Sequence, residues 1–292
     1  MAFSILTDTS ANMPSEQLRQ QHVSVIPFSY FIEEKEYTCL DTAAFDAEQY
    51  YHAMREGMRV TTSQINPQRY IDHMEPLLQQ GEELLYIGMS SGISGSYASA
   101  EAAAAQLREK YPQCKIRLID TLSASLGEGI LVLKAIECRD QEMSLDETAD
   151  LLEALRHCVC QIFTVDDLMH LRRSGRISNA TALVGTVLQI KPLLKGNEEG
   201  KIVNFAKIRG RKKAIEAIAE KYDALVAGAE IQTVGIAHAG CPEDAAMLET
   251  LLRRHKPPKE ILTVRYEPVT GSHVGPGALA LFFIGEPDVR SK

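Results

Sequence analysis

The chain has 292 residues, of which 45% are hydrophobic and 24% charged, which is ordinary for a globular protein large enough for two domains. Its formal net charge of −8 argues against a general nucleic-acid-binding surface. No apolar run approaches the roughly 20 residues of a membrane-spanning helix, and the start MAFSILTDTS lacks the basic and apolar segments of a signal peptide. We therefore expect a cytoplasmic protein.

The six cysteines give little indication of a metal or redox site. None of them forms a C-x-x-C motif, and the C-x-C pair Cys158 and Cys160 is weak evidence by itself. Without an export signal, free thiols are the expected state. We expect no metal and no other cofactor.

The first half of the chain alternates segments typical of strands with segments typical of helices. Short apolar runs predict strands at 4–7, 22–28, 84–89 and 115–119. Helices are expected from Pro14, over 45–55, from about Pro67, and over 96–111 and 130–139. This alternation predicts a parallel sheet with helices on both faces. Since ligands bind at the carboxyl ends of the strands in such sheets, we expect the polar clusters near residues 8, 62, 94 and 121 to converge at one edge.

The loop 90–97, SSGISGSY, joins one of these strands to a helix. Six of its eight residues are Ser or Gly, more than ordinary helix capping requires. The first N–H groups of a helix are unpaired and its dipole favours negative charge, so hydroxyls beside them suit a carboxylate or phosphate. The cluster Thr61-Thr62-Ser63-Gln64 is interpreted as a second hydroxyl-rich helix entrance. Simple helix capping is the structural alternative for such an entrance.

The second half is also predicted to be α/β, with longer loops. A helix over 145–158 closes the first half, so we divide the chain into domains 1–158 and 159–292. Strands are expected at 161–165, 200–207, 233–238, 261–265 and 278–284. Helices are expected at 181–188, from the basic run RGRKK at 209–213 to about 226, and at 243–255, with GSHVGPG at 271–277 as a loop.

Several motifs follow one another in a recognisable order. They are TDTSANMP from residue 7, TTSQINP at 61–67, SSGISGSYASA at 90–100, DTLSASLGEG at 120–129, LRRSGRIS at 171–178 and GSHVGPGALALFF at 271–283. Together they resemble the DegV family of bacterial fatty-acid-binding proteins, over a stretch from Thr7 to Ile284. Departures from the usual motifs at Ser174, Ile65-Asn66 and Ala280 bear on chain-length preference and kinase compatibility more than on the fold.

The resemblance implies two α/β domains with a long-chain fatty acid between them, its tail in an apolar tunnel. The residues that match the family's carboxylate contacts are Thr62, Ser94 and the backbone of Gly95, with Ser63 as a neighbouring candidate. On this basis we expect a lipid carrier with no catalytic activity of its own, and a monomer. The chain length and saturation of the bound acid stay open.

The resemblance also implies a partner enzyme. In family members that work with a fatty acid kinase, the carrier presents the bound acid, and the kinase uses ATP to convert it to an acyl phosphate that stays on the carrier. The acyl phosphate can then serve phospholipid synthesis. The residues that match phosphate-stabilising positions are Arg176, Arg209 and His273, and arginine suits phosphate through its planar fork of donors. Helix capping by Arg176 and plain solvent exposure of the other two are the alternatives.

The expected partners are thus a long-chain fatty acid and a fatty acid kinase, with no nucleic acid and no stable membrane insertion. Transient contact with a membrane would allow lipid exchange.

Two other functions remain open. The pentapeptide 88–92, GMSSG, fits the G-x-S-x-G nucleophile elbow of hydrolases, which would make Ser90 the nucleophile of a lipid-ester hydrolase. The chain order allows a triad with Asp120 or Asp166 and with His238 or His273, but no HGGG-like oxyanion segment is present. A nucleotide-binding module is a weaker alternative. The chain contains no G-x-x-x-x-G-K-[ST] motif, and no G-x-G-x-x-G motif follows a predicted strand.

Overall fold

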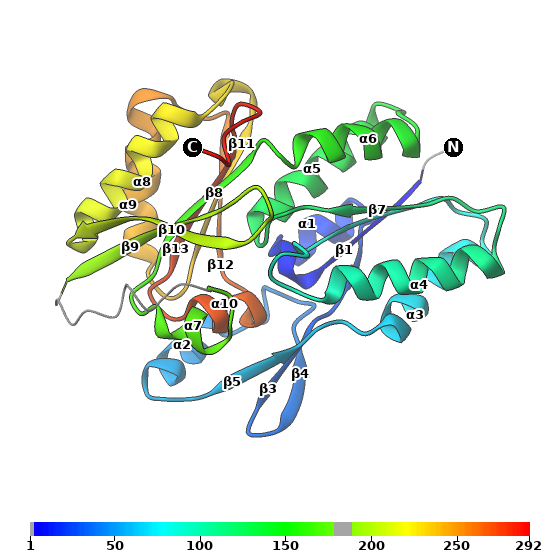
Figure 1. Cartoon of the computed structure of the whole chain (residues 1–292), viewed down its shortest axis with the longest axis horizontal. Helices are drawn as coiled ribbons and strands as arrows, with labels where there is room; N and C mark the ends of the chain where they lie inside the picture. The colour runs from blue at the N-terminus through cyan, green and yellow to red at the C-terminus, as the bar shows by residue number, and fades with distance from the viewer. Residues whose placement is uncertain (1–2, 178–188) are drawn as a thin grey trace.

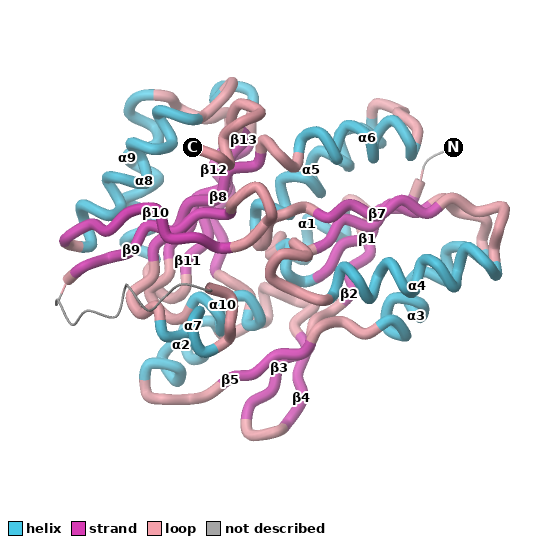
Figure 2. Tube along the Cα trace, viewed as in Figure 1, coloured by secondary structure: helices cyan, strands magenta, loops and turns pink. Residues whose placement is uncertain are grey.

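The structure is a computed structural model that describes residues 3–177 and 189–292. The strands within these ranges form a four-stranded, a three-stranded and a six-stranded sheet. Helices pack around the two larger sheets (Figures 1 and 2). The helix that we expected at 181–188 lies outside the described residues.

The four-stranded sheet is parallel and is built from the first half of the chain. Its strand order is β2-β1-β6-β7, with β1 Ser4–Asp8, β2 Ser24–Ile26, β6 Leu84–Gly88 and β7 Ile116–Asp120. In Figure 1, α3 and α4 lie below the sheet, and α5 and α6 lie above it. The helix bounds are α1 Ser15–Gln20, α3 Pro67–Gln79, α4 Ser96–Lys110, α5 Leu126–Asp140 and α6 Leu145–Leu155. This arrangement confirms the predicted parallel sheet flanked by helices.

The three-stranded sheet was not expected. It consists of β3 Ser29–Ile32, β4 Lys35–Thr38 and β5 Val60–Ser63, paired antiparallel, with α2 Ala47–Arg55 between β4 and β5. The predicted strand at 22–28 is therefore shorter, and the cluster at 61–64 begins as strand β5. Three consecutive β-branched residues, 60–62, favour this extended conformation. The entrance of α3 is instead capped by Asn66, whose side chain accepts a bond from the backbone N–H of Arg69.

The six-stranded sheet belongs to the second half and is mixed. Its order is β10-β9-β8-β13-β11-β12, and only β11 and β12 are parallel neighbours. The bounds are β8 Val159–Thr164, β9 Ile190–Gly196, β10 Ile202–Arg209, β11 Thr233–His238, β12 Glu260–Arg265 and β13 Leu279–Ile284. The helices of this half are α7 Met169–Arg173, α8 Arg211–Leu225, α9 Pro242–His255 and α10 Pro268–Val274. We did not expect β9, and α10 replaces part of the predicted loop at 271–277.

The two faces of the six-stranded sheet are covered differently. Along β13, Leu279, Leu281 and Phe283 join the apolar cluster of α8 and α9, whereas Ala280 and Phe282 face the larger cluster that includes the first half of the chain. This alternation is the period of two that a strand imposes. The strands of the smaller sheets all precede residue 158 and those of the large sheet all follow it, but the main core contains residues from both halves.

The Ser/Gly loop 90–97 is fastened to the second half by close contacts. Ser90 is fully buried; its hydroxyl donates to the carbonyl of Gly200 at 3.0 Å and accepts from the N–H of Gly92 at 3.1 Å. A Cβ on Gly92 would lie 2.4 Å from the carbonyl oxygen of Glu199. Glycine at position 92 is therefore required for the loop to approach the β9–β10 turn.

Candidate functional site

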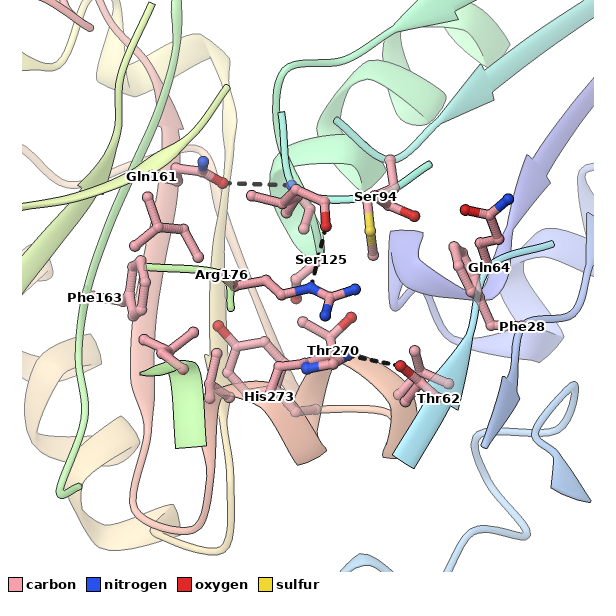
Figure 3. Close-up of a pocket in the computed structure, with 18 of the residues that line it drawn as sticks. Phe28, Thr62, Gln64, Ser94, Ser125, Gln161, Phe163, Arg176, Thr270 and His273 are labelled. Carbon is pink, nitrogen blue, oxygen red and sulfur yellow. Dashed lines mark hydrogen bonds between the residues drawn. The ribbon is translucent and has the colours of Figure 1, made fainter. Parts of the chain in front are cut away.

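A cavity lies between the two halves of the chain and encloses about 720 Å³, including the part open to solvent. Its walls are mainly apolar and come from both halves: Phe28, Met89 and Ile93 from the first, and Phe163, Leu171 and Phe282 from the second. A molecule in the cavity would therefore contact both halves (Figure 3).

Five of the seven predicted site residues line this cavity, although they come from distant parts of the sequence. They are Thr62, Ser63, Ser94, Arg176 and His273. Gly95 lies beside the cavity but does not line it: it precedes α4, and a Cβ there would be 2.1 Å from the side-chain oxygen of Gln64. Arg209 is exposed at the end of β10, paired with Ile190, and does not line the cavity.

Thr62 and His273 form the polar contact that closes one side of the cavity. The Thr62 hydroxyl lies 2.9 Å from Nε2 of His273, which α10 presents 211 residues further along the chain. Burial, together with the charge of Arg176, lowers the pKa of His273 to about 4. The imidazole is therefore neutral near pH 7 and carries one ring proton.

Ser94 shares the helix entrance with Ser96. Its hydroxyl accepts from the N–H of Ser96 at 3.2 Å and donates to the Ser96 hydroxyl at 3.0 Å. The N-cap of α4 is Gly95, without a side-chain cap, and the Ser94 hydroxyl accepts only from the N–H of Ser96, the first residue of the helix. Ser94 also lines the cavity. Rotation of its hydroxyl would direct the proton to a ligand without loss of the backbone bond.

Arg176 reaches the cavity because of the way in which α7 ends. Gly175 has φ +74°, its N–H bonds to the carbonyl of Arg172, and the N–H of Arg176 bonds to that of Leu171 at 2.9 Å. These two bonds are those of a Schellman motif, which reverses the chain after a helix. Figure 3 shows the guanidinium in the middle of the cavity.

Arg176 has no carboxylate partner in the part of the chain that the structure describes. Its side chain donates to two backbone carbonyls, those of Ile93 at 3.2 Å and of Ser174. Among the residues that the structure describes, no ion pair involves Arg176. The side chain is half-buried, and this burial lowers its pKa. A positive charge placed in this way, in a mainly apolar cavity, is suited to an anionic ligand.

The Ser90 hydrolase alternative is not supported by this geometry. The Ser90 side chain is inaccessible, and its hydroxyl is occupied by the bonds to Gly200 and Gly92. Asp120, offered as an acid of the triad, instead accepts from the N–H and hydroxyl of Ser91 at 3.1 and 2.6 Å. No histidine of the described chain forms a hydrogen bond with Ser90.

Three of the four polar clusters expected to converge at one edge of the sheet do so at the ends of β1, β6 and β7. There Asp8 accepts from the N–H of Met89 at 3.4 Å, and Asp120 accepts from Ser91. Residues 62 and 94 meet at the cavity, but Thr62 reaches it from the small antiparallel sheet. Asp8 is fully buried and hydrogen-bonded to Ser10 and Tyr86. It contributes to the core beneath the loop and does not line the cavity.

The polar residues that line the cavity and were not predicted as site residues are Gln64, which belongs to the recognised cluster 61–64, and Ser125, Gln161, Tyr266 and Thr270. Ser125 lies within the motif DTLSASLGEG, and Thr270 precedes His273 by one helical turn, so both were close to recognised motifs. No sequence motif marks Gln161 as a site residue, since it lies within a mainly apolar strand. Its side-chain oxygen accepts from the N–H of Ala124 at 3.4 Å.

Across residues 3–177 and 189–292, no group of three or more His, Cys, Asp or Glu side chains is arranged to hold a metal ion. None of the helices in these ranges is long and apolar enough to cross a membrane. All six cysteines are free.

Comparisons with known proteins agree with this fold. The family model "Uncharacterised protein, DegV family" matches residues 2–286. A DegV domain-containing protein of Clostridium perfringens is 37% identical over 97% of this chain and 98% of its own length. A fatty-acid-binding DegV family protein of Thermus thermophilus has TM-score 0.88 and 29% identity, over 98% of this chain and all of its own. DegV of Bacillus subtilis, described as a fatty acid binding protein, has TM-score 0.83 and 30% identity with coverage of 98% and 100%. The chain therefore belongs to the DegV family.

Proposed function

We propose that this protein binds a long-chain fatty acid, with the acyl tail in the cavity and the carboxylate beside Arg176, Thr62 and Ser94. The observation that carries the proposal is the guanidinium of Arg176, which has no carboxylate partner among the described residues and lies in a mainly apolar cavity. An isolated carboxylate is costly to bury, and a charged donor with two hydroxyls would offset that cost. Burial of the tail would contribute roughly 0.8 kcal/mol per CH₂.

The hydrogen-bond donors of the site are consistent with this assignment. When neutral His273 carries its proton on Nε2, it donates to Thr62, and the Thr62 proton is then available to a carboxylate oxygen. Ser94 offers a second proton beside the N-terminus of α4, where negative charge is favoured. Ser63 follows Thr62 on β5 and is the third candidate hydroxyl.

We also propose that the bound acid is presented to a separate fatty acid kinase. A carboxylate oxygen would attack the γ-phosphorus of ATP, and ADP would leave, so that acyl phosphate remains on the carrier. Arg176 and His273 lie together at the cavity and are suited to hold the new phosphate. Arg209, exposed outside the cavity, is retained as a candidate contact for the incoming phosphate donor. The support for this step is the family resemblance.

Native mass spectrometry of the purified protein, followed by denaturation and lipid analysis, tests the binding function. We expect an adduct of roughly 250–290 Da that is released as a fatty acid, because burial of the acyl tail makes dissociation slow. Absence of an adduct, together with no uptake of added palmitate or oleate, would contradict the proposal.

Replacement of Ser94 by alanine is expected to weaken fatty-acid binding by about 1–3 kcal/mol, the cost of leaving a buried polar group short of a partner. Titration of the lipid-free variant with palmitate gives the affinity. The control is Ser91→Ala, in the same loop but outside the cavity lining, where the hydroxyl bonds to Asp120. Equal affinities for the two variants would remove Ser94 from the site.

A further inference from the structure

The cavity contains a second polar region, formed by Thr270 and Ser125. Thr270 is 8% exposed and lines the cavity. Its hydroxyl lies near the Glu267 carboxyl group, where it lowers the pKa of Glu267, but it forms no hydrogen bond of normal geometry within the described chain. A buried hydroxyl left in this state is costly to the protein. Because the oxygen belongs to the wall of a ligand cavity, a bound molecule can supply the missing partner.

Ser125 presents a second hydroxyl proton to the same cavity. It is 1% exposed, lines the cavity, and its oxygen accepts from the side-chain amide of Asn12 at 3.2 Å. No acceptor for the Ser125 proton is found among the described residues. The backbone at Ser125 has φ 53° and ψ −141°, a strained conformation for a residue other than glycine, of the kind that collects at functional sites.

One asparagine joins the segments that carry these two hydroxyls. While the amide nitrogen of Asn12 donates to Ser125, its oxygen accepts from the backbone N–H of Glu267 at 2.9 Å. Glu267 caps α10 and accepts from the N–H of Thr270. The start of α5 and the start of α10 are therefore held together, with a hydroxyl from each at the cavity.

The position of Thr270 on α10 places the second polar region close to the end of the cavity where we propose that the carboxylate binds. Thr270 and His273 are three residues apart on one helix and lie on the same face, with roughly 5–6 Å between their Cβ atoms. Figure 3 shows both beside the Arg176 guanidinium. An acyl chain whose carboxylate lies at Arg176 would pass Thr270 within its first few carbons.

Resting on the proposed fatty-acid function, we propose that Thr270 and Ser125 form a subsite for an oxygen atom carried by the acyl chain near its carboxylate. Both residues offer protons, so the group that they recognise must accept hydrogen bonds, as a hydroxyl or a keto oxygen does. The preferred ligands are then hydroxy or oxo fatty acids rather than plain ones. A site built to bond such an oxygen discriminates more strongly than an apolar pocket does.

The test compares palmitate, 2-hydroxypalmitate, 3-hydroxypalmitate and 16-hydroxypalmitate, titrated into lipid-free wild type, Thr270→Val and Thr270→Ser. We expect wild type to prefer the 2- or the 3-hydroxy acid to palmitate. In Thr270→Val this preference should fall about tenfold or more, while Thr270→Ser keeps it. The 16-hydroxy acid, whose oxygen is at the far end, should show no dependence on residue 270.

The matched control is Thr164→Val on β8. Thr164 is fully buried and, within the described chain, its hydroxyl likewise forms no hydrogen bond of normal geometry, but it does not line the cavity. Both valine variants remove an unsatisfied hydroxyl and should raise the melting temperature of the lipid-free protein by about 1–3 °C. Only Thr270→Val should change the preference between acids.

Three results would overturn the inference. One is a ratio of affinities for hydroxy and plain acids that is the same in wild type and Thr270→Val. Another is an equal loss of affinity for all four acids in Thr270→Val, which would make Thr270 a carboxylate contact. The third is failure of wild type to bind any of the acids, which would overturn the proposed function itself and is thereby distinguished from the other two.

Discussion

Replacement of Asp8 by asparagine is expected to lower the free energy of unfolding by about 2–4 kcal/mol, whereas Glu128→Gln is expected to change it by less than about 1 kcal/mol. Both carboxyl groups are fully buried beneath the Ser/Gly loop and are bridged by the hydroxyl of Ser10. The same chemical change should therefore have very different effects on stability at two neighbouring positions.

The proton count of this cluster explains the difference. The Ser10 oxygen lies 2.5 Å from Asp8 Oδ1 and 2.6 Å from Glu128 Oε2, and its single proton can serve only one of them. The other contact requires a proton on a carboxyl group. Asp8 faces donors only, namely the N–H of Ser10, the hydroxyl of Tyr86 and the N–H of Met89. Asp8 is thus the ionised partner.

Glu128 is the neutral partner by the same argument. Its protonated Oε2 then donates to Ser10, while its Oε1 accepts from the Thr7 hydroxyl at 2.9 Å. Burial, and next the negative charge of Asp8, raise the pKa of Glu128 well above its ordinary value. Glutamine, with one amide donor and one acceptor, reproduces a neutral carboxyl group. Asparagine at position 8 would instead turn N–H groups toward other donors.

The neutral state of Glu128 also predicts a pH dependence. An acid whose pKa is raised in the folded state contributes stability that is fully present below its unfolded pKa, near 4.5, and is lost as the pH rises through the folded value. Urea denaturation at several pH values between 5 and 8 should show the wild-type stability falling relative to Glu128→Gln as the pH rises. Parallel curves, or a strongly destabilised Glu128→Gln, would assign the proton elsewhere.

The elements of the fold that could be predicted are those marked by a pattern in the neighbouring sequence. The parallel sheet followed from alternating apolar runs and helix formers. The β3–β4 hairpin did not, because its turn places Glu33 and Glu34 at positive φ, 49° and 67°, without the Asn-Gly or Asp-Gly signal typical of such turns. Helix α10 was obscured by Gly271 within it and by Gly275 and Gly277 after it, although Glu267 caps it and Pro268 starts it.

The residues of the candidate site that could be predicted are those that belong to the recognised motifs. Thr62, Ser94, Arg176 and His273 were all predicted and all line one cavity. Their mutual geometry was not predictable, because the Thr62–His273 contact joins a strand and a helix 211 residues apart. Whether the Thr270 hydroxyl finds a hydrogen-bond partner depends on the residues around it in the folded chain. The neighbouring sequence does not contain that information.

Replacement of Arg176 by methionine is expected to weaken binding of palmitate by about 2–4 kcal/mol, or roughly 30- to 1,000-fold, as truncation of one partner of a buried charge pair does. Methionine keeps an unbranched side chain of similar reach but removes the charge and all donors. Because the guanidinium has no carboxylate partner in the described part of the protein, its loss should leave the lipid-free protein folded, with little change in its melting temperature.

Two comparisons make the Arg176 experiment specific to the carboxylate. Hexadecanol has the same tail without the charge, so its affinity should be similar in wild type and Arg176→Met. Arg209→Met removes an exposed arginine outside the cavity and should leave the affinity for palmitate unchanged. If Arg176→Met bound palmitate as tightly as wild type, the carboxylate would lie elsewhere. If hexadecanol binding fell equally, Arg176 would instead hold the shape of the cavity through its bond to Ile93.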